Sequence, residues 1–421
     1  MEKSLDRKLA EIHAGGATKA FILADAKDAD MAFGIAAPGR SPEHADGGYR
    51  TLEEFRDIIR ENTRQGLLDI MLMSVSTSEV LTIAERLFDD SPVTPAIRAN
   101  DTTDIHVARG AAYPAQASRP FRTALLDHAQ AGRIDPGDSQ RRTGVDLGLY
   151  SITFNNDVDL DRRTLEAYKE FRVEAEKKGF RHFLEVFDPN APAKAVPPEK
   201  LGGFINDLIV RTLAGVASRA RPLFLKIVYH GPKFMEELVR YDPHLVVGVL
   251  GGSAGTTYDA FKLLDEARRH GARAALFGRK INNAEHQLSF IQFLRWIADG
   301  EIGPEEAVKA YHGVLEKLNI KPRRPLARDM QLTGNLTGYG ASGATISVPS
   351  SVASARAAGA STPAARKSPP PESSGPKALK GPLGADRPVP GDYPRKADGS
   401  PDFAKMTPAQ RLAYHRARVG R

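Results

Sequence analysis

The stretch "LVVGVLGGSAGTTYDAFKLLDEARRHGARAALFGRKI", residues 245–281, decides the fold class. It begins with an apolar run, passes through a glycine-rich turn and an amphipathic segment, and ends in a second apolar run. Short apolar runs bounded by turns are typical of strands that are buried on both faces. An amphipathic segment between two such runs predicts a helix, so the stretch predicts a βαβ unit with parallel strands.

The same alternation extends over the first 320 residues. Eight apolar runs predict eight strands, at residues 20–25, 67–73, 93–99, 147–154, 180–187, 223–229, 245–251 and 274–281. Strands that alternate with helices predict an α/β fold with a parallel sheet, and eight such units match a closed (β/α)₈ TIM barrel. An open doubly wound sheet is the alternative. No G-x-G-x-x-G follows the first run, which argues against dinucleotide binding.

The composition divides the chain into three parts. We expect the barrel over 1–325, a low-complexity flexible linker over 326–400 that is rich in Ala, Ser, Gly and Pro, and a short basic helical segment over 401–421. In the last part, Thr407 to Gln410 has the pattern of a capping box with proline at the first helical position, which predicts a helix from about 408 to 418.

The net charge of +7 is unevenly distributed. Residues 322–421 hold 16 Lys or Arg and 6 Asp or Glu, which gives +10, whereas residues 1–321 hold 43 and 46, which gives −3. The basic character therefore belongs to the tail, and we expect no nucleic-acid groove in the barrel.

The residue types exclude several function classes. The chain has no cysteine, so it forms no disulfide and no thiolate metal site. Its eleven histidines show no pair at metal-ligand spacing near a strand end, and we expect neither a metal nor a cofactor. No apolar run approaches the roughly 18 residues of a membrane span, so we expect a soluble, cytoplasmic protein.

Polar residues lie near the ends of the predicted strands. In a barrel, functional groups gather at the C-terminal ends of the strands. The residues found there are Asp25, Arg98, Tyr150, Glu185, Lys226 and His230, followed by Gly251, Gly252 and Ser253 after the seventh run and Gly278 and Arg279 after the eighth.

Lys226 is the most unusual of these residues. It lies in the strand-like run "RPLFLKIVYHGP", residues 221–232, where Phe224 and Val228 would share its face. Apolar surroundings lower the pKa of a lysine, and a neutral amine forms Schiff bases with carbonyl compounds. Glu185, on the neighbouring predicted strand, could shuttle the protons. The alternative is that Lys226 merely pairs with a carboxylate or extends to the rim.

The two glycine turns predict an anion site. Bare N–H groups before a helix, and the permanently charged guanidinium of Arg279, would bind phosphate. A phosphate site after the seventh and eighth strands recurs in barrels. The long connection over 100–146, which holds His106, Arg109, Arg119 and Arg122, is a candidate lid, a decoration or an interface.

The order of these residues resembles the class I, Schiff-base-forming aldolases of the deoxyribose-phosphate, tagatose-bisphosphate and archaeal-type fructose-bisphosphate group. The resemblance covers about 15–320. It implies that Lys226 in "FLKIVYHG" is the Schiff-base lysine, that Glu185 in "FLEVF" is the acid/base, and that Asp25 is the first-strand aspartate. "GGSAG" and "FGRKI" would bind the phosphate of a phosphorylated ketose, and Asp25 or Tyr150 would assist in proton transfer. Arg98 and His230 are expected to line the substrate.

Other functions are compatible with the same residues. A barrel could isomerise a sugar phosphate through Glu185, with Lys226 acting only electrostatically. A catalytically silent barrel could serve as scaffold or cargo through its tail. The terminal helix could dock the protein into a protein shell or a multi-enzyme assembly, or the basic tail could bind loosely to acidic partners, RNA or membrane. We also expect a homo-oligomer.

Overall fold

The structure is a computed structural model that describes residues 1–15, 18–41, 47–106, 108–191, 195–252, 255–333 and 393–397, together with 402, 405–407 and 410. The chain divides into two compact units, Met1–Val352 and Ala353–Arg421. The first unit contains the barrel and the candidate site.

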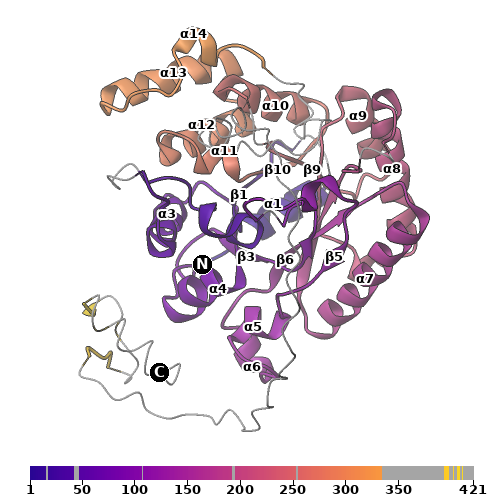
Figure 1. The fold of residues 1–421 in the computed structure, drawn as a ribbon, viewed down its shortest axis with the longest axis horizontal. Coiled ribbons are helices and arrows are strands. Elements are labelled where there is room, and N and C mark those ends of the chain that lie inside the picture. The colour runs from indigo at the N-terminus through magenta and orange to yellow at the C-terminus, as the bar shows by residue number, and fades with distance from the viewer. Residues whose placement is uncertain are drawn as a thin grey trace, which may run out of the picture. The chain divides into compact units, whose positions relative to one another are not determined.

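Eight parallel strands close into a barrel (Figure 1). The order around the barrel is β1-β10-β9-β8-β7-β6-β3-β2, and β2 pairs with β1. The strands are β1 (Ile22–Lys27), β2 (Ile70–Met73), β3 (Thr94–Arg98), β6 (Leu147–Thr153), β7 (Arg181–Phe187), β8 (Leu225–Ile227), β9 (Val247–Leu250) and β10 (Ala274–Phe277). Seven of them lie within one of the eight apolar runs, and β1 extends two residues beyond the first run, to Lys27. The prediction of a closed barrel is confirmed, and the open sheet is excluded.

The last run is shorter as a strand than expected. β10 ends at Phe277, because Gly278 is the N-cap of a short helix, α11 (Arg279–Asn282). A side chain at Gly278 would meet the carbonyl oxygen of Ala26 at 2.9 Å, so only glycine fits between the ends of β10 and β1. The residues 278–281 therefore form a turn and a helix rather than a continuation of the strand.

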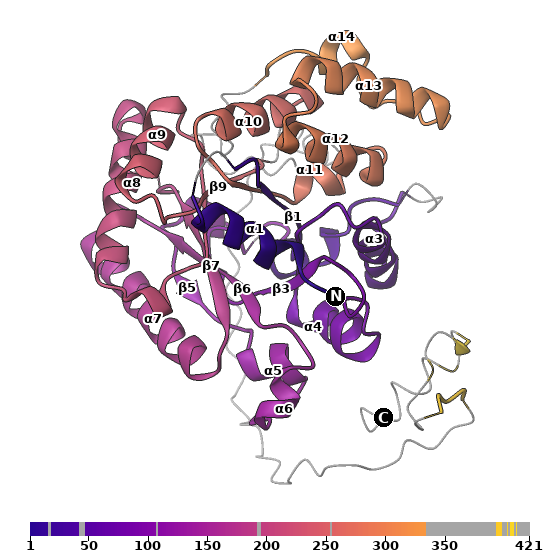
Figure 2. The same cartoon turned by 180° about the vertical axis from the view of Figure 1, so that it is seen from behind.

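Helices surround the barrel (Figures 1 and 2). Several begin at a side-chain cap, as α3 does with the capping box of Thr51 and Glu54. The helices are α1 (Ser4–His13), α2 (Asp30–Phe33), α3 (Leu52–Arg64), α4 (Val75–Ser78), α5 (Leu126–Ala131), α6 (Asp138–Arg141), α7 (Val158–Lys177), α8 (Pro198–Ala214), α9 (Pro232–Tyr241), α10 (Thr257–Arg269), α12 (Gln287–Asp299), α13 (Pro304–Lys317) and α14 (Leu326–Asp329).

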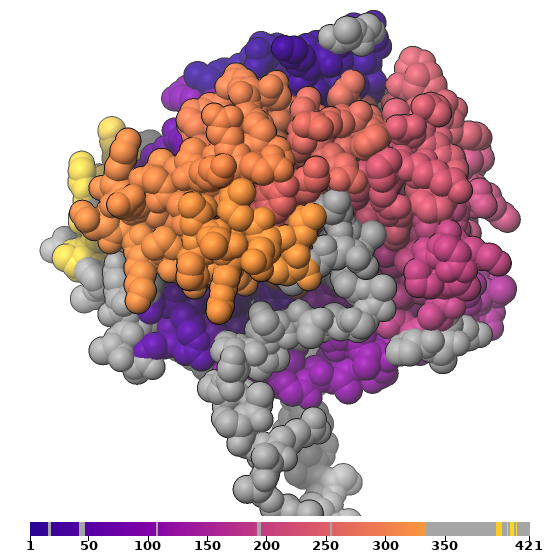
Figure 3. All heavy atoms as spheres, turned by 90° about the horizontal axis from the view of Figure 1, so that it is seen from above, coloured from indigo at the N-terminus to yellow at the C-terminus, as the bar shows by residue number. Residues whose placement is uncertain are grey.

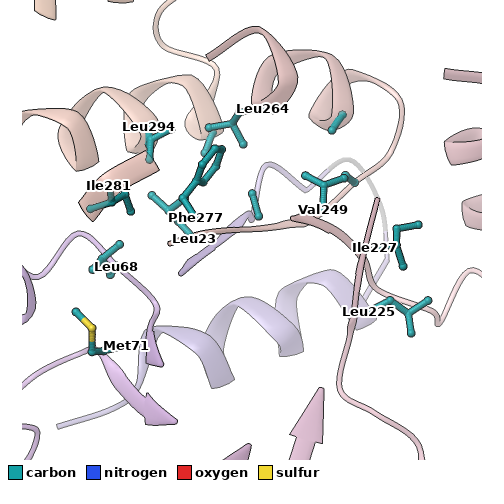
Figure 4. Close-up of a cluster of buried hydrophobic side chains, with 14 of the residues drawn as sticks. Leu23, Leu68, Met71, Leu225, Ile227, Val249, Leu264, Phe277, Ile281 and Leu294 are labelled. Atoms are coloured by element: carbon teal, nitrogen blue, oxygen red, sulfur yellow. The ribbon is translucent and has the colours of Figure 1, made fainter. Parts of the chain in front are cut away.

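Each barrel strand is buried on both faces. Residues such as Leu23, Leu225 and Val249 point outward and pack against the helices, as the cluster in Figure 4 shows. The alternate residues, such as Ala24, Leu149 and Phe224, form a second cluster inside the barrel. Burial of both faces explains why the strands are continuous apolar runs instead of alternating ones.

Helix α1 covers the N-terminal end of the barrel (Figure 2). Its apolar residues Leu5 and Leu9 are buried in the inner cluster, with the first inward residues of the strands. The barrel is thereby sealed at this end, so access to its interior is from the C-terminal end, where active sites of this fold lie.

The long connection between β3 and β6 has structure of its own. A hairpin of β4 (Asp101–Thr102) and β5 (Pro120–Phe121) contacts β6 through β4, and α5 and α6 follow it in the chain. Arg122 pairs with Glu174 of α7 at 2.7 Å, and the ring of His106 packs against Phe121. The side chains of Arg109 and Arg119 are exposed.

Three helices follow the last barrel strand and its short helix. α12 and α13 pack with α10, and α14 packs with α13. Figure 3 shows the orange residues of the first unit lying against the salmon-coloured residues that precede them. Contacts continue to Thr333, whose amide and hydroxyl both donate to Asp259 of α10. The expected domain end at 325 thus precedes the last described element of the first unit.

Little of the tail is described. The capping box predicted at Thr407 is present, because Thr407 and Gln410 exchange hydrogen bonds of 2.9 and 3.3 Å. Most of the helix expected over 408–418, and most of the linker expected over 326–400, lie outside the described residues. Within the described part of the chain, no helix is long and apolar enough to cross a membrane.

Candidate active site

Lys226 and Glu185 form an ion pair inside the barrel. They are register partners on β8 and β7, and Nζ of Lys226 lies 2.5 Å from Oε1 of Glu185. The side chains are only 8% and 2% exposed. A buried lysine requires such a partner, and the carboxylate can accept the proton that the ammonium must lose before the nitrogen becomes nucleophilic.

Two further polar side chains hold the glutamate, and a third holds one of these two. The hydroxyl of Ser151 donates to Oε2 of Glu185 at 2.5 Å, and the guanidinium of Arg98 lies 3.5 Å from the same oxygen. Arg98 also donates to Ser151 at 2.9 Å and to the carboxylate of Asp28. Glu185 is therefore fixed by β3 and β6 on one side while it faces Lys226 on the other.

The charges of this layer balance. Burial alone would lower the pKa of Arg98, but the carboxylates of Asp28 and Glu185 outweigh burial and raise it, so Arg98 is a permanent cation. Arg98 lies beside Asp28, and Lys226 lies beside Glu185. Each basic side chain of this layer thus has a carboxylate partner, as a buried polar site requires.

Aromatic rings form the floor of the site. Phe183 and Phe224 precede Glu185 and Lys226 by two residues, and their rings stack with centroids 4.5 Å apart. Gly248 lies beside Lys226 in register on β9, and a side chain there would meet the Cβ of Ala274 at 2.7 Å. The residues beneath Lys226 are therefore closely packed.

Two of the predicted catalytic residues lie on the other face of their strands. Asp25 points outward, where Nζ of Lys27 contacts it at 3.0 Å and Asn62 of α3 donates to it at 2.9 Å. Tyr150 also points outward and stacks on Phe171 of α7 with centroids 4.4 Å apart. The expectation that Asp25 or Tyr150 assists in proton transfer is therefore corrected. Each side chain lies on the outer face of its strand, whereas Lys226 faces the interior of the barrel.

Asp28 is the carboxylate that the end of β1 contributes to the interior. It lies an odd number of residues after Asp25, so it falls on the opposite face. Its carboxylate is buried and bound to Arg98. Arg98, predicted as a substrate-lining residue, lies in the same cluster as Lys226 and Glu185.

His230 lies at the end of the β8 segment. Its Nε2 is 3.0 Å from Oδ1 of Asp188, which follows β7. Its Cβ lies close to Gly202 of α8, where an added side chain would meet it at 2.9 Å. The contacts of His230 are thus with Asp188 and α8.

The two predicted phosphate turns follow β9 and β10 as expected. Gly252 has a φ of 64°, which favours glycine, but the N–H of Gly251 already donates to the carbonyl of Leu276. The guanidinium of Arg279 lies 5.8 Å from the ring centroid of Phe33. Ser253 lies outside the described residues.

The N-terminus of α10 is already capped by the chain itself. The N–H of Thr257 donates to Asp329 of α14 at 2.8 Å, and the N–H of Thr256 donates to Asp259 at 2.6 Å. Lys280 donates to the carbonyls of Gly255 and Thr256, and burial lowers the pKa of its ammonium to about 8. These first amides are therefore occupied, and an anion here would have to use other groups of the two turns.

Comparisons with known proteins agree with the fold. No family model matches the sequence, and no curated protein matches it. A solved structure of a Schiff-base-forming fructose-1,6-bisphosphate aldolase is 17% identical, with a TM-score of 0.50, over 70% of this chain and 99% of that one. The chain has the fold of this aldolase. An archaeal fructose-1,6-bisphosphate aldolase, with its catalytic lysine bound to the carbinolamine intermediate, matches at 17% identity, a TM-score of 0.50, and 70% and 100% coverage.

Sequence reasoning missed Asp28 and Ser151. All six residues of β1 are buried, so no alternation of polar and apolar residues marks its inner face. Ser151 lies inside the apolar run of β6, where a small hydroxyl gives no signal of its own. Only the register of β6 with β7, which pairs Ser151 with Glu185, shows that it belongs to the site.

Proposed function

We propose that this chain is a class I aldolase that cleaves or forms a carbon–carbon bond in a phosphorylated ketose through a Schiff base on Lys226. The observation that carries the proposal is the contact of 2.5 Å between Lys226 and Glu185, in the interior of a barrel whose other end is sealed. A structural lysine would also have a carboxylate partner. What favours catalysis is that this pair lies inside the barrel, whose C-terminal end is the open one, and that it has the two groups that iminium chemistry needs.

The steps follow from these two groups. Lys226 passes a proton to Glu185, and its free electron pair attacks the ketose carbonyl carbon. The carbinolamine takes up a proton from Glu185 and loses water, which leaves an iminium. Glu185, again a carboxylate, then accepts the proton of the hydroxyl on the bond to be cleaved, and the bonding electrons move into an enamine while the aldehyde leaves. Protonation of the enamine and hydrolysis regenerate Lys226.

Arg98 and Ser151 position the acid/base in this scheme. Each contacts Oε2 of Glu185, which leaves Oε1 for Lys226. Because Glu185 is held on one side and buried, its oxygen needs little rearrangement to move a proton, which is the benefit of a preorganised site. Asp28 in turn holds Arg98.

We propose that the phosphate of the substrate binds near the turns after β9 and β10. Arg279, on the first turn of α11, and the glycine backbone of 251–252 and 278 support this placement, because small residues allow an anion to approach the backbone. The charge of the phosphate would then position the ketose carbonyl over Lys226.

Product analysis distinguishes this function from isomerisation. We expect the purified full chain, incubated with ketose mono- and bisphosphates, to release two shorter carbonyl compounds that mass spectrometry detects. An isomerase would instead yield a product of unchanged mass. Isomerisation without cleavage, or no turnover of any phosphorylated ketose, would overturn the proposal.

A further inference from the structure

The layer of the barrel above Lys226 has an apolar side. Phe187, Val228 and Leu250 follow Glu185, Lys226 and Gly248 by two residues, so they face inward one layer closer to the C-terminal end. They form a cluster of their own and are exposed by 4% or less. None of these side chains can donate or accept a hydrogen bond.

The long connection between β3 and β6 completes this cluster. Ile105, in the turn after β4, packs against the three residues. Its position is fixed by Asp104, whose carboxylate accepts from Thr153 of β6 at 2.8 Å and from Ser118 at 2.9 Å. The N–H of Ile105 also donates to Asp104 at 3.1 Å. Ile105 is therefore held over the end of the barrel by a buried carboxylate.

The opposite side of the same layer is polar. Thr153 lies two residues beyond Ser151 on β6, so the Asp104–Thr153 pair is stacked above the Ser151–Glu185 pair. A substrate carbon attached to the carbonyl above Lys226 would meet carboxylate and hydroxyl groups toward β6. Toward β7, β8 and β9 the side chains described in this layer are the hydrocarbon of Phe187, Val228 and Leu250.

We propose that Ile105, Phe187, Val228 and Leu250 form an apolar collar that selects carbonyl substrates with a methyl or methylene group, rather than a hydroxyl-bearing carbon, on one side of the reacting carbonyl. The inference rests on the proposed function and narrows its substrate class to ketoses with a deoxy carbon. A hydroxyl against the collar would lose its water without gaining a partner, whereas hydrocarbon gains contact with four side chains. An apolar pocket discriminates against an added hydroxyl by about 10- to 100-fold.

Three small ketones test the collar directly. Acetone, hydroxyacetone and dihydroxyacetone carry none, one and two hydroxyls on an otherwise identical skeleton. The full chain is incubated with each ketone and cyanoborohydride, and the adduct at residue 226 is measured by peptide mass, relative to N-acetyl-lysine amide under the same conditions. We expect hydroxyacetone to react fastest, because it satisfies both sides, and dihydroxyacetone to react about 10-fold more slowly or worse.

Variants of the collar should change this ratio. Ile105→Ser should reduce the preference for hydroxyacetone over dihydroxyacetone to within about twofold, whereas Ile105→Val should retain it. Val228→Thr places a hydroxyl in the collar at nearly constant volume, and it should have the same effect as Ile105→Ser if the latter does not fold. Ile134→Ser is the matched control, because Ile134 belongs to the same connection between β3 and β6 but its side chain is 62% exposed.

The outcomes separate the collar from the function on which it rests. Adducts at Lys226 with equal reactivity toward the three ketones, or with a preference that neither Ile105→Ser nor Val228→Thr changes, would overturn the collar and leave the Schiff base standing. The absence of any adduct at Lys226 would overturn both.

Discussion

At the scale of single residues, the site depends on which face of a strand each side chain occupies. The inward, paired position of Lys226 and Glu185 could be expected from the sequence, because a charge within an apolar run needs a polar or charged partner. Asp25 satisfies the same criterion, yet it faces outward because Lys27 supplies a second buried charge as its partner. A pair of opposite charges two residues apart can satisfy itself on either face, so the sequence did not distinguish Asp25 from Asp28.

Glu185 is expected to control the rate of the proposed reaction. We predict that Glu185→Gln lowers kcat for ketose cleavage by about 10²- to 10⁴-fold, since the amide cannot move the protons. Tyr150→Phe should keep kcat within about twofold, because its ring faces α7. Steady-state assays on both variants, with circular dichroism as a check on folding, test this. A Tyr150→Phe variant that loses as much activity as Glu185→Gln would contradict the orientation described for Tyr150.

The buried pair of Asp25 and Lys27 is expected to act in stability. Both side chains are 0% exposed, and burial raises the pKa of Asp25 and lowers that of Lys27, with the mutual contact opposing both shifts. We predict that Lys27→Met alone destabilises the barrel by about 3–5 kcal/mol, because it leaves an unpaired carboxylate. The double change Asp25→Leu with Lys27→Met should recover part of that loss.

Urea unfolding of the two single variants and the double variant measures this coupling. Strictly additive effects would show that the pair does not interact.

At the scale of elements, sequence patterns located the strands better than their connections. Each of the eight apolar runs coincides with a barrel strand, although β1 continues two residues past its run, because burial on both faces requires continuous hydrophobicity. The connection over 100–146 gave no comparable pattern, and its hairpin of β4 and β5 has only two residues in each strand. The hairpin depends on long-range contacts such as Asp104 with Thr153, and local sequence does not encode these.

The packing of α7 on β7 predicts a pH dependence of stability. His182 is buried there with Nε2 2.8 Å from the hydroxyl of Tyr168, and burial, with a smaller effect of Arg172, lowers the pKa of its imidazole to about 3. The unfolded chain, with a histidine pKa of about 6.5, takes up a proton as the pH falls through 6.5, while the folded chain does not. The contribution of His182 to the free energy of unfolding is therefore fully present above pH 6.5 and is lost progressively as the pH falls from 6.5 to about 3.

We predict that the free energy of unfolding falls by about 2 kcal/mol between pH 7 and pH 5 through this group alone. His182→Phe should remove this component of the pH dependence. His244→Phe, at an exposed histidine, should retain it. Equal pH dependence of the wild type and His182→Phe in urea unfolding would contradict the buried neutral state of His182.

At the scale of the whole molecule, the closure of the sheet could be proposed but not established from the sequence. Eight βα units are compatible with an open sheet, and only the pairing of β1 with both β2 and β10 closes the barrel. The barrel boundary expected at 325 stays a prediction. The described contacts continue past it through α14 to Thr333, which donates to Asp259 of α10.

Truncation tests this boundary. We predict that a chain ending at 333 unfolds at the same temperature as the full chain, whereas a chain ending at 325 unfolds several degrees lower. The shorter chain loses Asp329, which accepts from Thr257 of α10 and lies 3.0 Å from His312, and a lost helix cap costs about 1–2 kcal/mol. Asp329→Asn in the full chain should show part of the same decrease. Identical melting of the two truncated chains would contradict a stabilising role for α14.

Borohydride trapping tests the central claim most directly. The full chain is incubated with a phosphorylated ketose and sodium borohydride, and its peptides are mapped by mass. The account predicts a stable adduct on residue 226 that requires both reagents and is absent from Lys226→Met. An active enzyme that forms no adduct, or an adduct located instead on Lys27 or Lys280, would contradict it.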